Sequence, residues 1–133
     1  MAILNQTEHL MIKLCMCVKR LPAISREAFL HYWRHHHAPL VAELREDLGI
    51  ARYAQTVLLP DDAVQQGLAK SRGTLAYPFD GLGEVWWHSL AQMQAARSTP
   101  AAQAASRRLY EDERRFVNHA ESYLWLARED VIF

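Results

Sequence analysis

Apolar side chains take every second position in the segment MIKLCMCVKR, residues 11–20. A repeat of two residues predicts a β-strand, because successive side chains of a strand point to opposite faces of the sheet. Three further short apolar segments favour strands as well, at residues 50–59, 80–87 and about 119–127. The sequence therefore predicts four strands, enough for a four-stranded sheet.

A different spacing governs residues 25–49, where apolar side chains recur three and four positions apart. That spacing lines one face of a helix. Ser25 is a suitable N-cap for this helix, and Gly49 ends it. Pro39 falls inside the helix and removes one backbone hydrogen bond, which predicts a kink near residues 35–38.

The second half of the chain predicts a long connection and more helices. Residues 60–79 contain several Gly and Pro residues, with room for a short helix at 61–70. Ser89 begins a capping pattern for a short helix over 90–97, and a longer helix follows over about 99–117.

The order of these elements is β-α-β-β-α-β with an extra short helix. This order is typical of the ferredoxin-like α+β fold, with a four-stranded antiparallel sheet. We expect a single domain over residues 11–128, preceded by a flexible arm at 1–10 and followed by a tail at 129–133.

Helices on one side of such a sheet leave its other face in need of cover. The strands carry large aromatic side chains, including Trp86, Trp87, Tyr123 and Trp125. A second copy of the sheet would cover them economically, so we expect a homodimer, a dimeric α/β barrel whose two sheets enclose a cavity.

Composition narrows the function classes. Lys+Arg and Asp+Glu are equal at 15 each, which argues against a nucleic-acid partner. No segment is apolar enough to span a membrane, and the first ten residues lack the features of a signal peptide. Cys15 and Cys17 are too close along one strand to form a good disulfide, which favours a reducing, cytoplasmic setting.

Three segments together resemble the EthD family. They are FLHYWRHHHAPLV at 29–41, PFDGLGEVWWHS at 78–89 and YEDERRFVN at 110–118. The resemblance implies a dimeric α/β barrel and an association with oxidoreductase pathways. It also implies kinship with decarboxylases, dehydratases, isomerases, cyclases and haem-degrading monooxygenases on the same barrel, among which the fold cannot choose.

His37 is the first candidate for catalysis. It lies on the apolar helix face between Trp33 and Val41, where a hydrophobic side chain is expected. A buried neutral imidazole is suited to accept a proton. An equally good interpretation is a structural histidine that donates to a carbonyl freed by Pro39.

Asp80 and Glu84 are candidate partners of His37. They lie four residues apart on a predicted strand and therefore share a face. Carboxylates that face a closed cavity can serve as acid or base. The structural alternatives are a turn at Asp80-Gly81 and a salt bridge for Glu84. Asp112 lies on the apolar face of the last helix, where we expect it to bond a backbone N–H or a histidine in a structural role.

A hydrophobic binding pocket is the expected setting for this chemistry. Its candidate substrate-binding residues are Trp33, Tyr53, Trp86, His119 and Tyr123. Plain packing is the commoner role of aromatic side chains on strands.

We expect no metal site and no cofactor. His31 and His35 share a helix face, but no HExxH motif or second pair of cysteines accompanies them. Glycine-rich nucleotide motifs and a nucleophile elbow are also missing from the sequence.

The sequence therefore predicts a pocket for a small aromatic or lactone-like metabolite. The chemistry would be cofactor-free proton transfer: dehydration, decarboxylation, cyclisation or isomerisation. The alternatives are a non-catalytic binding or accessory protein of an oxidative pathway, and a haem-binding or oxidoreductase-associated protein that uses His37 or His119.

Overall fold

The computed structural model describes residues 11–60 and 63–133, and the arm expected at 1–10 lies outside them. A sheet of four antiparallel strands forms the centre of the fold, in the spatial order β2-β3-β1-β4. The strands are β1 (Ile12–Val18), β2 (Arg52–Thr56), β3 (Gly81–Trp87) and β4 (Tyr123–Arg128).

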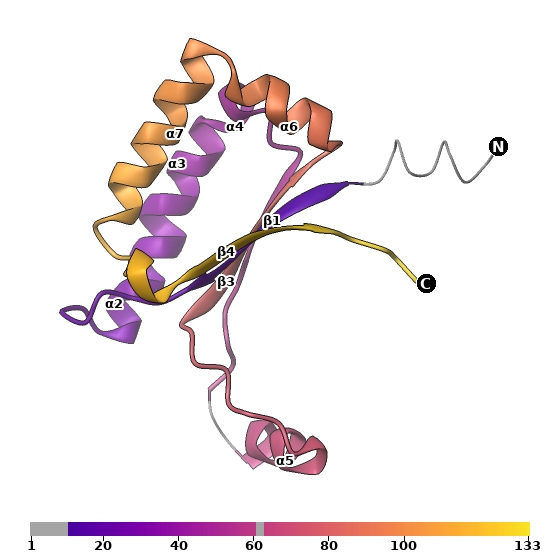
Figure 1. Ribbon diagram of the computed structural model, residues 1–133. Helices are drawn as coiled ribbons and strands as arrows, with labels where there is room; N and C mark the ends of the chain where they lie inside the picture. Colours follow the sequence, from indigo (N-terminus) through magenta and orange to yellow (C-terminus); the bar gives the residue numbers. More distant parts are fainter. Residues whose placement is uncertain (1–10, 61–62) are drawn as a thin grey trace.

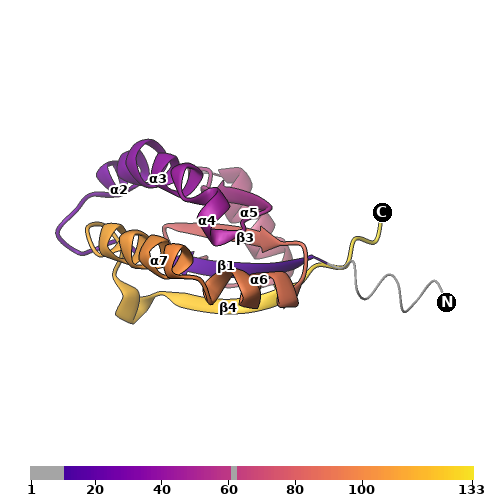
Figure 2. The same cartoon turned by 90° about the horizontal axis from the view of Figure 1, so that it is seen from above.

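Helices cover one face of this sheet (Figures 1 and 2). They are α2 (Arg26–Tyr32), α3 (Ala38–Glu43), α4 (Arg45–Leu48), α6 (Leu90–Arg97) and α7 (Pro100–Glu113). Helix α5 (Ala63–Arg72) instead lies beyond one end of the sheet, away from the helical layer (Figure 1). The predicted ferredoxin-like α+β arrangement with a four-stranded antiparallel sheet is confirmed.

The predicted kink is a turn of π-helix, η1 (Trp33–His37), between α2 and α3. The backbone N–H of Ala38 donates to the carbonyl of Trp33, five residues earlier. Pro39 has no N–H to donate to the turn before it, so the helix accommodates an extra residue there. This turn sets the direction of the side chains of Trp33 and His37, which are both buried.

Several boundaries differ from those predicted. Helix α7 ends at Glu113, and residues 119–121 form a 3-10 turn, η2 (His119–Glu121), before β4 begins. The cause is a long-range tie, in which the N–H of Asn118 donates to the carbonyl of Lys19. His119 therefore precedes the last strand instead of lying on it.

The core lies between the helices and the sheet in two clusters. One contains Val18, Phe29, Trp33, Phe116 and Val117. The other contains Val41, Ile50, Trp87 and Met93. Both clusters include side chains from the helical layer and from the sheet, so burial of apolar surface holds the two layers together.

Cys15 and Cys17 point to the sheet face away from the helices, and both are free thiols. Among the described residues, no helix has the length and apolar character needed to cross a membrane.

Gly81 provides a test of how tightly the layers pack. A Cβ added there would lie 2.5 Å from Cζ3 of Trp33. We expect Gly81→Ala to lower the free energy of unfolding by about 1–3 kcal/mol, since the ring must shift within a packed core. Chemical denaturation measures this change.

Gly67 is the matched control, because it lies in α5 and an added Cβ would meet nothing within 4 Å. Gly67→Ala should raise the stability by about 0.5–1 kcal/mol through helix propensity. A Gly81→Ala variant as stable as the native protein would show that the Trp33 contact is loose.

Candidate active site

A cavity of about 770 Å³ lies between the sheet and the helices of one chain. All four strands of the sheet contribute side chains to it, among them Leu14, Tyr53, Val85 and Leu124. The sequence suggested a cavity between two sheets; this one lies on the opposite, helix-covered face. Because side chains alternate along a strand, every second residue of β1 and β3 borders it, whereas Tyr123 and Leu124 of β4 are both in the lining.

His37 borders this cavity and is held by Asp112 of α7. Its Nδ1 lies 2.8 Å from Oδ2 of Asp112, and its side chain is 8% exposed. Within the described part of the chain, Nε2 has no hydrogen-bond partner, and it is not among the fully buried atoms that lack one. The second ring nitrogen is therefore not fully enclosed by the protein, and the residue that carries it belongs to the cavity lining.

Asp112 also accepts a hydrogen bond of 2.5 Å from the hydroxyl of Tyr32 at its other oxygen, Oδ1. Burial raises the pKa of Tyr32, and its hydrogen bond to Asp112 and the charge of that carboxylate add to the effect. Tyr32 therefore stays a neutral donor near pH 7. With Tyr32 on one oxygen and His37 on the other, the carboxylate is fixed in orientation.

This arrangement favours one tautomer of His37. The carboxylate accepts a hydrogen bond from Nδ1–H, which leaves the lone pair on Nε2. A base within hydrogen-bond reach of a bound molecule is the geometry that general acid–base catalysis needs. The sequence suggested a backbone carbonyl as the structural partner of His37, whereas the actual partner is a carboxylate.

A second histidine–carboxylate pair borders the same cavity. Nε2 of His119, in η2, lies 3.1 Å from Oε1 of Glu113 at the end of α7. The imidazole of His119 also contacts the ring of Tyr110, with 5.2 Å between ring centroids. This pair is more exposed than the first, with side chains 32% and 23% accessible.

Tyr53 lies on the sheet wall of the cavity. Its hydroxyl accepts a hydrogen bond of 2.8 Å from Gln55, whose amide also donates to the carbonyl of Trp33 at 2.9 Å. Burial raises the pKa of Tyr53 to about 12, although the hydrogen bond to Gln55 opposes the shift. The hydroxyl therefore stays protonated and is available as a donor.

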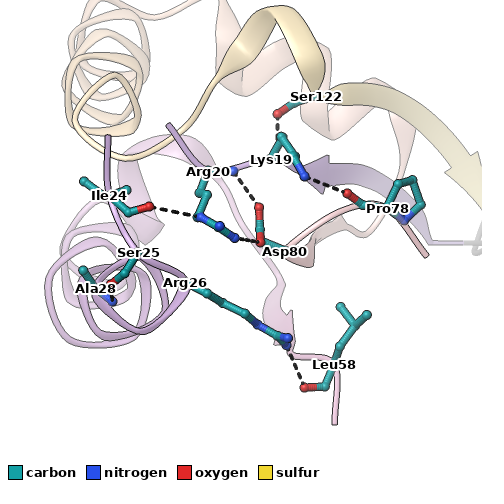
Figure 3. A network of polar contacts seen from close by, with 10 residues as sticks. All are labelled: Lys19, Arg20, Ile24, Ser25, Arg26, Ala28, Leu58, Pro78, Asp80 and Ser122. Carbon is teal, nitrogen blue, oxygen red and sulfur yellow. Dashed lines mark hydrogen bonds and ion pairs between the residues drawn. The ribbon is translucent and has the colours of Figure 1, made fainter. Parts of the chain in front are cut away.

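Asp80 does not line the cavity. It forms an ion pair of 2.7 Å with Arg20 and accepts the backbone N–H of the same residue at 2.8 Å (Figure 3). Its own N–H donates to the carbonyl of Val18. Asp80 thus fastens the end of β1 to the start of β3, in place of the turn suggested by Asp80-Gly81.

Glu84 lies on the sheet face away from the cavity, where it forms a salt bridge of 2.7 Å with Lys13. Its hydrogen bond to Lys13 raises the pKa of that ammonium group, against the opposing effect of burial. Trp86 is on the same face, between Lys13 at 5.5 Å and Arg52 at 4.4 Å from its ring. The sheet separates Glu84 from His37.

The predicted site residues thus fall into two groups. Those that border the cavity are Trp33, His37, Tyr53, His119 and Tyr123; those outside its lining are Asp80, Glu84 and Trp86. The sequence suggested a backbone N–H or a histidine as the partner of Asp112, and the structure shows that the partner is a histidine, His37. Sequence reasoning missed Glu113.

Among the described residues, no three His, Cys, Asp or Glu side chains gather closely enough to hold a metal ion. The ring centroids of His31 and His35 are 4.7 Å apart, but within residues 11–60 and 63–133 no third ligand accompanies the pair.

A model of the EthD domain matches residues 21–120. No curated protein matches the chain in sequence. An ethyl tert-butyl ether degradation (EthD) family protein from Bacillus halodurans C-125 is similar in structure, with a TM-score of 0.59 and 18% identity over 91% of this chain and 100% of that one.

Two further solved structures share the fold. Hydroxynitrile lyase from Passiflora edulis has a TM-score of 0.58 and 10% identity, over 94% of this chain and 98% of that one. A dimeric ferredoxin-like protein of unknown function from Thermobifida fusca YX has a TM-score of 0.54 and 10% identity, over 90% and 92%. At these identities the likeness is one of fold.

Asp112 provides a test of the site's construction. We expect Asp112→Ala to lower the free energy of unfolding by about 2–4 kcal/mol, because Tyr32 and His37 each lose a partner in a largely buried place. Urea denaturation at pH 7 measures the loss.

Glu111→Ala is the control, since Glu111 is the exposed neighbour of Asp112 on α7. It should change stability by no more than about 0.5 kcal/mol. Equal effects of the two substitutions would contradict the assigned role of Asp112.

Proposed function

The chain belongs to the EthD domain family, and on that basis we propose that it binds a small aromatic or lactone-like metabolite in the cavity beneath its helices. There it catalyses cofactor-free proton transfer, with His37 as the general base or acid. The observation that carries this proposal is the buried His37–Asp112 pair, whose histidine borders the cavity and keeps Nε2 without a partner among the described residues.

The lining supports a hydrophobic ligand. Apolar side chains from the strands and the helices form most of the wall, with Trp33 and Trp87 among them. A volume of about 770 Å³ lies within the range of cavities that bury a ligand of one or a few rings. Tyr53 adds a neutral hydroxyl that can orient a carbonyl or hydroxyl of the ligand.

The chemistry follows from what His37 is able to do. Nε2 takes a proton from a carbon or hydroxyl of the ligand, and the charge that develops on the imidazole is stabilised by Asp112. The same nitrogen then returns the proton at another position or to a leaving group. Isomerisation, dehydration, decarboxylation and cyclisation all use such steps.

A hydroxynitrile lyase on the same fold supports a lyase-type reaction as one outcome. Asp80 and Glu84, which the sequence suggested as partners of His37, are engaged by Arg20 and Lys13. We assign the partner role to Asp112 instead.

A non-catalytic binding protein is the second candidate. Such a protein would use the apolar cavity to hold its ligand. An accessory role in an oxidative pathway is one form of this candidate. This candidate requires binding without turnover and tolerance of changes at His37.

We also propose that two chains associate through the sheet. Strand β4 is an edge strand, and its side chains Tyr123, Leu124, Trp125 and Leu126 are between 44% and 65% exposed. An edge strand with large exposed apolar side chains is normally covered by another chain. The dimeric ferredoxin-like neighbour supports a second copy as that cover.

Deuterium exchange tests the proton transfer without knowledge of the natural substrate. 2-Tetralone, a bicyclic ketone with acidic α-protons, should exchange them in D₂O faster with the protein than in buffer. His37→Gln should lower the catalysed rate about 100-fold, the share that general acid–base groups commonly supply. NMR follows the exchange.

His31→Gln is the control, since His31 is an exposed histidine of the preceding helix, α2. It should leave the rate unchanged. Binding of tetralone with no exchange above buffer, or full activity in His37→Gln, would reject catalysis and favour the binding protein.

Light scattering at micromolar concentration should give a mass of two chains of 15.3 kDa. Trp125→Lys should shift the protein toward the monomer, because it places a charge in the proposed contact. Leu90→Lys is the control, since Leu90 has nearly the same exposure, 43% against 44%, but lies on the helical side. A native monomer would contradict the dimer.

A further inference from the structure

We propose that the ligand of this cavity is an anion, whose carboxylate or equivalent acidic group is bound by Arg107 with help from Arg97. This inference rests on the proposed function, because it names the class of molecule that enters the same cavity. It requires the ligand to carry an acidic group, which the apolar lining alone does not.

The helix α7 presents a polar row to the cavity. Side chains three or four positions apart along it line the opening, namely Gln103, Ser106, Arg107, Tyr110 and Glu113. Such spacing places them on one side of the helix. Across the opening stand the apolar side chains of Leu124 and Leu126 from the exposed edge strand. The cavity therefore has an apolar interior and one polar rim.

Arg107 is free to bind a ligand. In the described part of the chain, neither Arg107 nor Arg97 makes an ion pair or a side-chain hydrogen bond. By contrast, Arg20, Arg108 and Arg128 are each paired with a carboxylate of this chain. Two cations that border the cavity thus have no internal counter-charge.

Glu113, a carboxylate in the same cavity lining as these cations, is already engaged. Glu113 bonds the imidazole of His119, at the other end of the row from Gln103. Arg97 enters the lining from α6, next to the same end of α7 as Gln103. The positive charge at that end of the opening is therefore left for a ligand to neutralise.

The spacing between Arg107 and the His37–Asp112 pair suits a ligand of one or two rings. Arg107 and Asp112 are five residues apart on α7, which corresponds to about 7–8 Å along the helix axis. His37 is fastened to Asp112. A molecule with its acidic group at Arg107 would thus extend its rings over the apolar interior toward the free nitrogen of His37.

Arginine is well suited to this task. The guanidinium group stays charged at every physiological pH and can donate two parallel hydrogen bonds to a carboxylate. Arg107 itself is exposed, so the strength of the pair would come from these charge-assisted hydrogen bonds. Arg107 would therefore orient the ligand as well as attract it.

A pair of probes that differ only in charge tests the proposal. Calorimetry at pH 7 and low salt should show that 2-naphthoate binds at least about tenfold more tightly than 2-naphthamide, since charge-assisted bonds are the stronger ones. Arg107→Met should abolish the preference while retaining the binding of 2-naphthamide. Arg97→Met should reduce the preference.

Arg108→Met is the matched control. Arg108 follows Arg107 on α7, but it pairs with Glu43 and lies outside the cavity lining. This variant should keep the preference for 2-naphthoate. Equal affinity of the native protein for the two probes, an equal loss in Arg108→Met, or binding of neither probe would overturn the proposal.

The outcomes separate this inference from the proposed function. Equal binding of the two probes together with His37-dependent exchange of 2-tetralone would reject the anionic ligand and leave the proton-transfer role standing. Failure of both probes to bind, together with no exchange, would reject the cavity as a functional site.

Discussion

The carboxylate of Asp112 is the interaction on which the arrangement of the site depends. It lies at the contact between α7 and the kinked first helix, and it bonds both Tyr32 and His37. A buried carboxylate is costly unless it is fully engaged, so its two bonds also join the two helices. The same contact fixes the imidazole of His37 at the cavity wall. Helix packing and candidate chemistry thus share one group.

The π-helical turn makes that contact geometrically feasible. Trp33 and His37 open and close the turn, and both are buried beneath the helical layer. The ring of Trp33 packs against Gly81, where no side chain larger than hydrogen fits without a shift. The ring of His37 packs against Phe116, with 5.1 Å between ring centroids. The packing of these two rings therefore stabilises the irregular turn. Turns of this kind are frequent at functional sites.

The other charged candidates are neutralised by neighbours that lie far away in the sequence. Glu84 pairs with Lys13 across the sheet, and Asp80 pairs with Arg20 where β1 ends. These ion pairs join neighbouring strands. Because each carboxylate is already paired with a cation, it is poorly suited to act as an acid or base. His37, Arg97 and Arg107 border the cavity on the helix side. The proposed function thus places its chemistry on the face of the sheet opposite to Glu84.

The amino-acid sequence by itself determined the elements and their order, because a repeat of two or of three to four residues depends only on local geometry. It also located the kink at Pro39 and marked His37 as unusual on an apolar face. Tertiary structure alone decided which partner His37 has, since Asp112 is 75 residues away. It also decided which strand face borders the cavity, and it placed Glu84 on the other one. A shift of one residue reverses a strand's faces, and pairs between distant residues depend on how whole elements pack, so neither can be derived from local pattern.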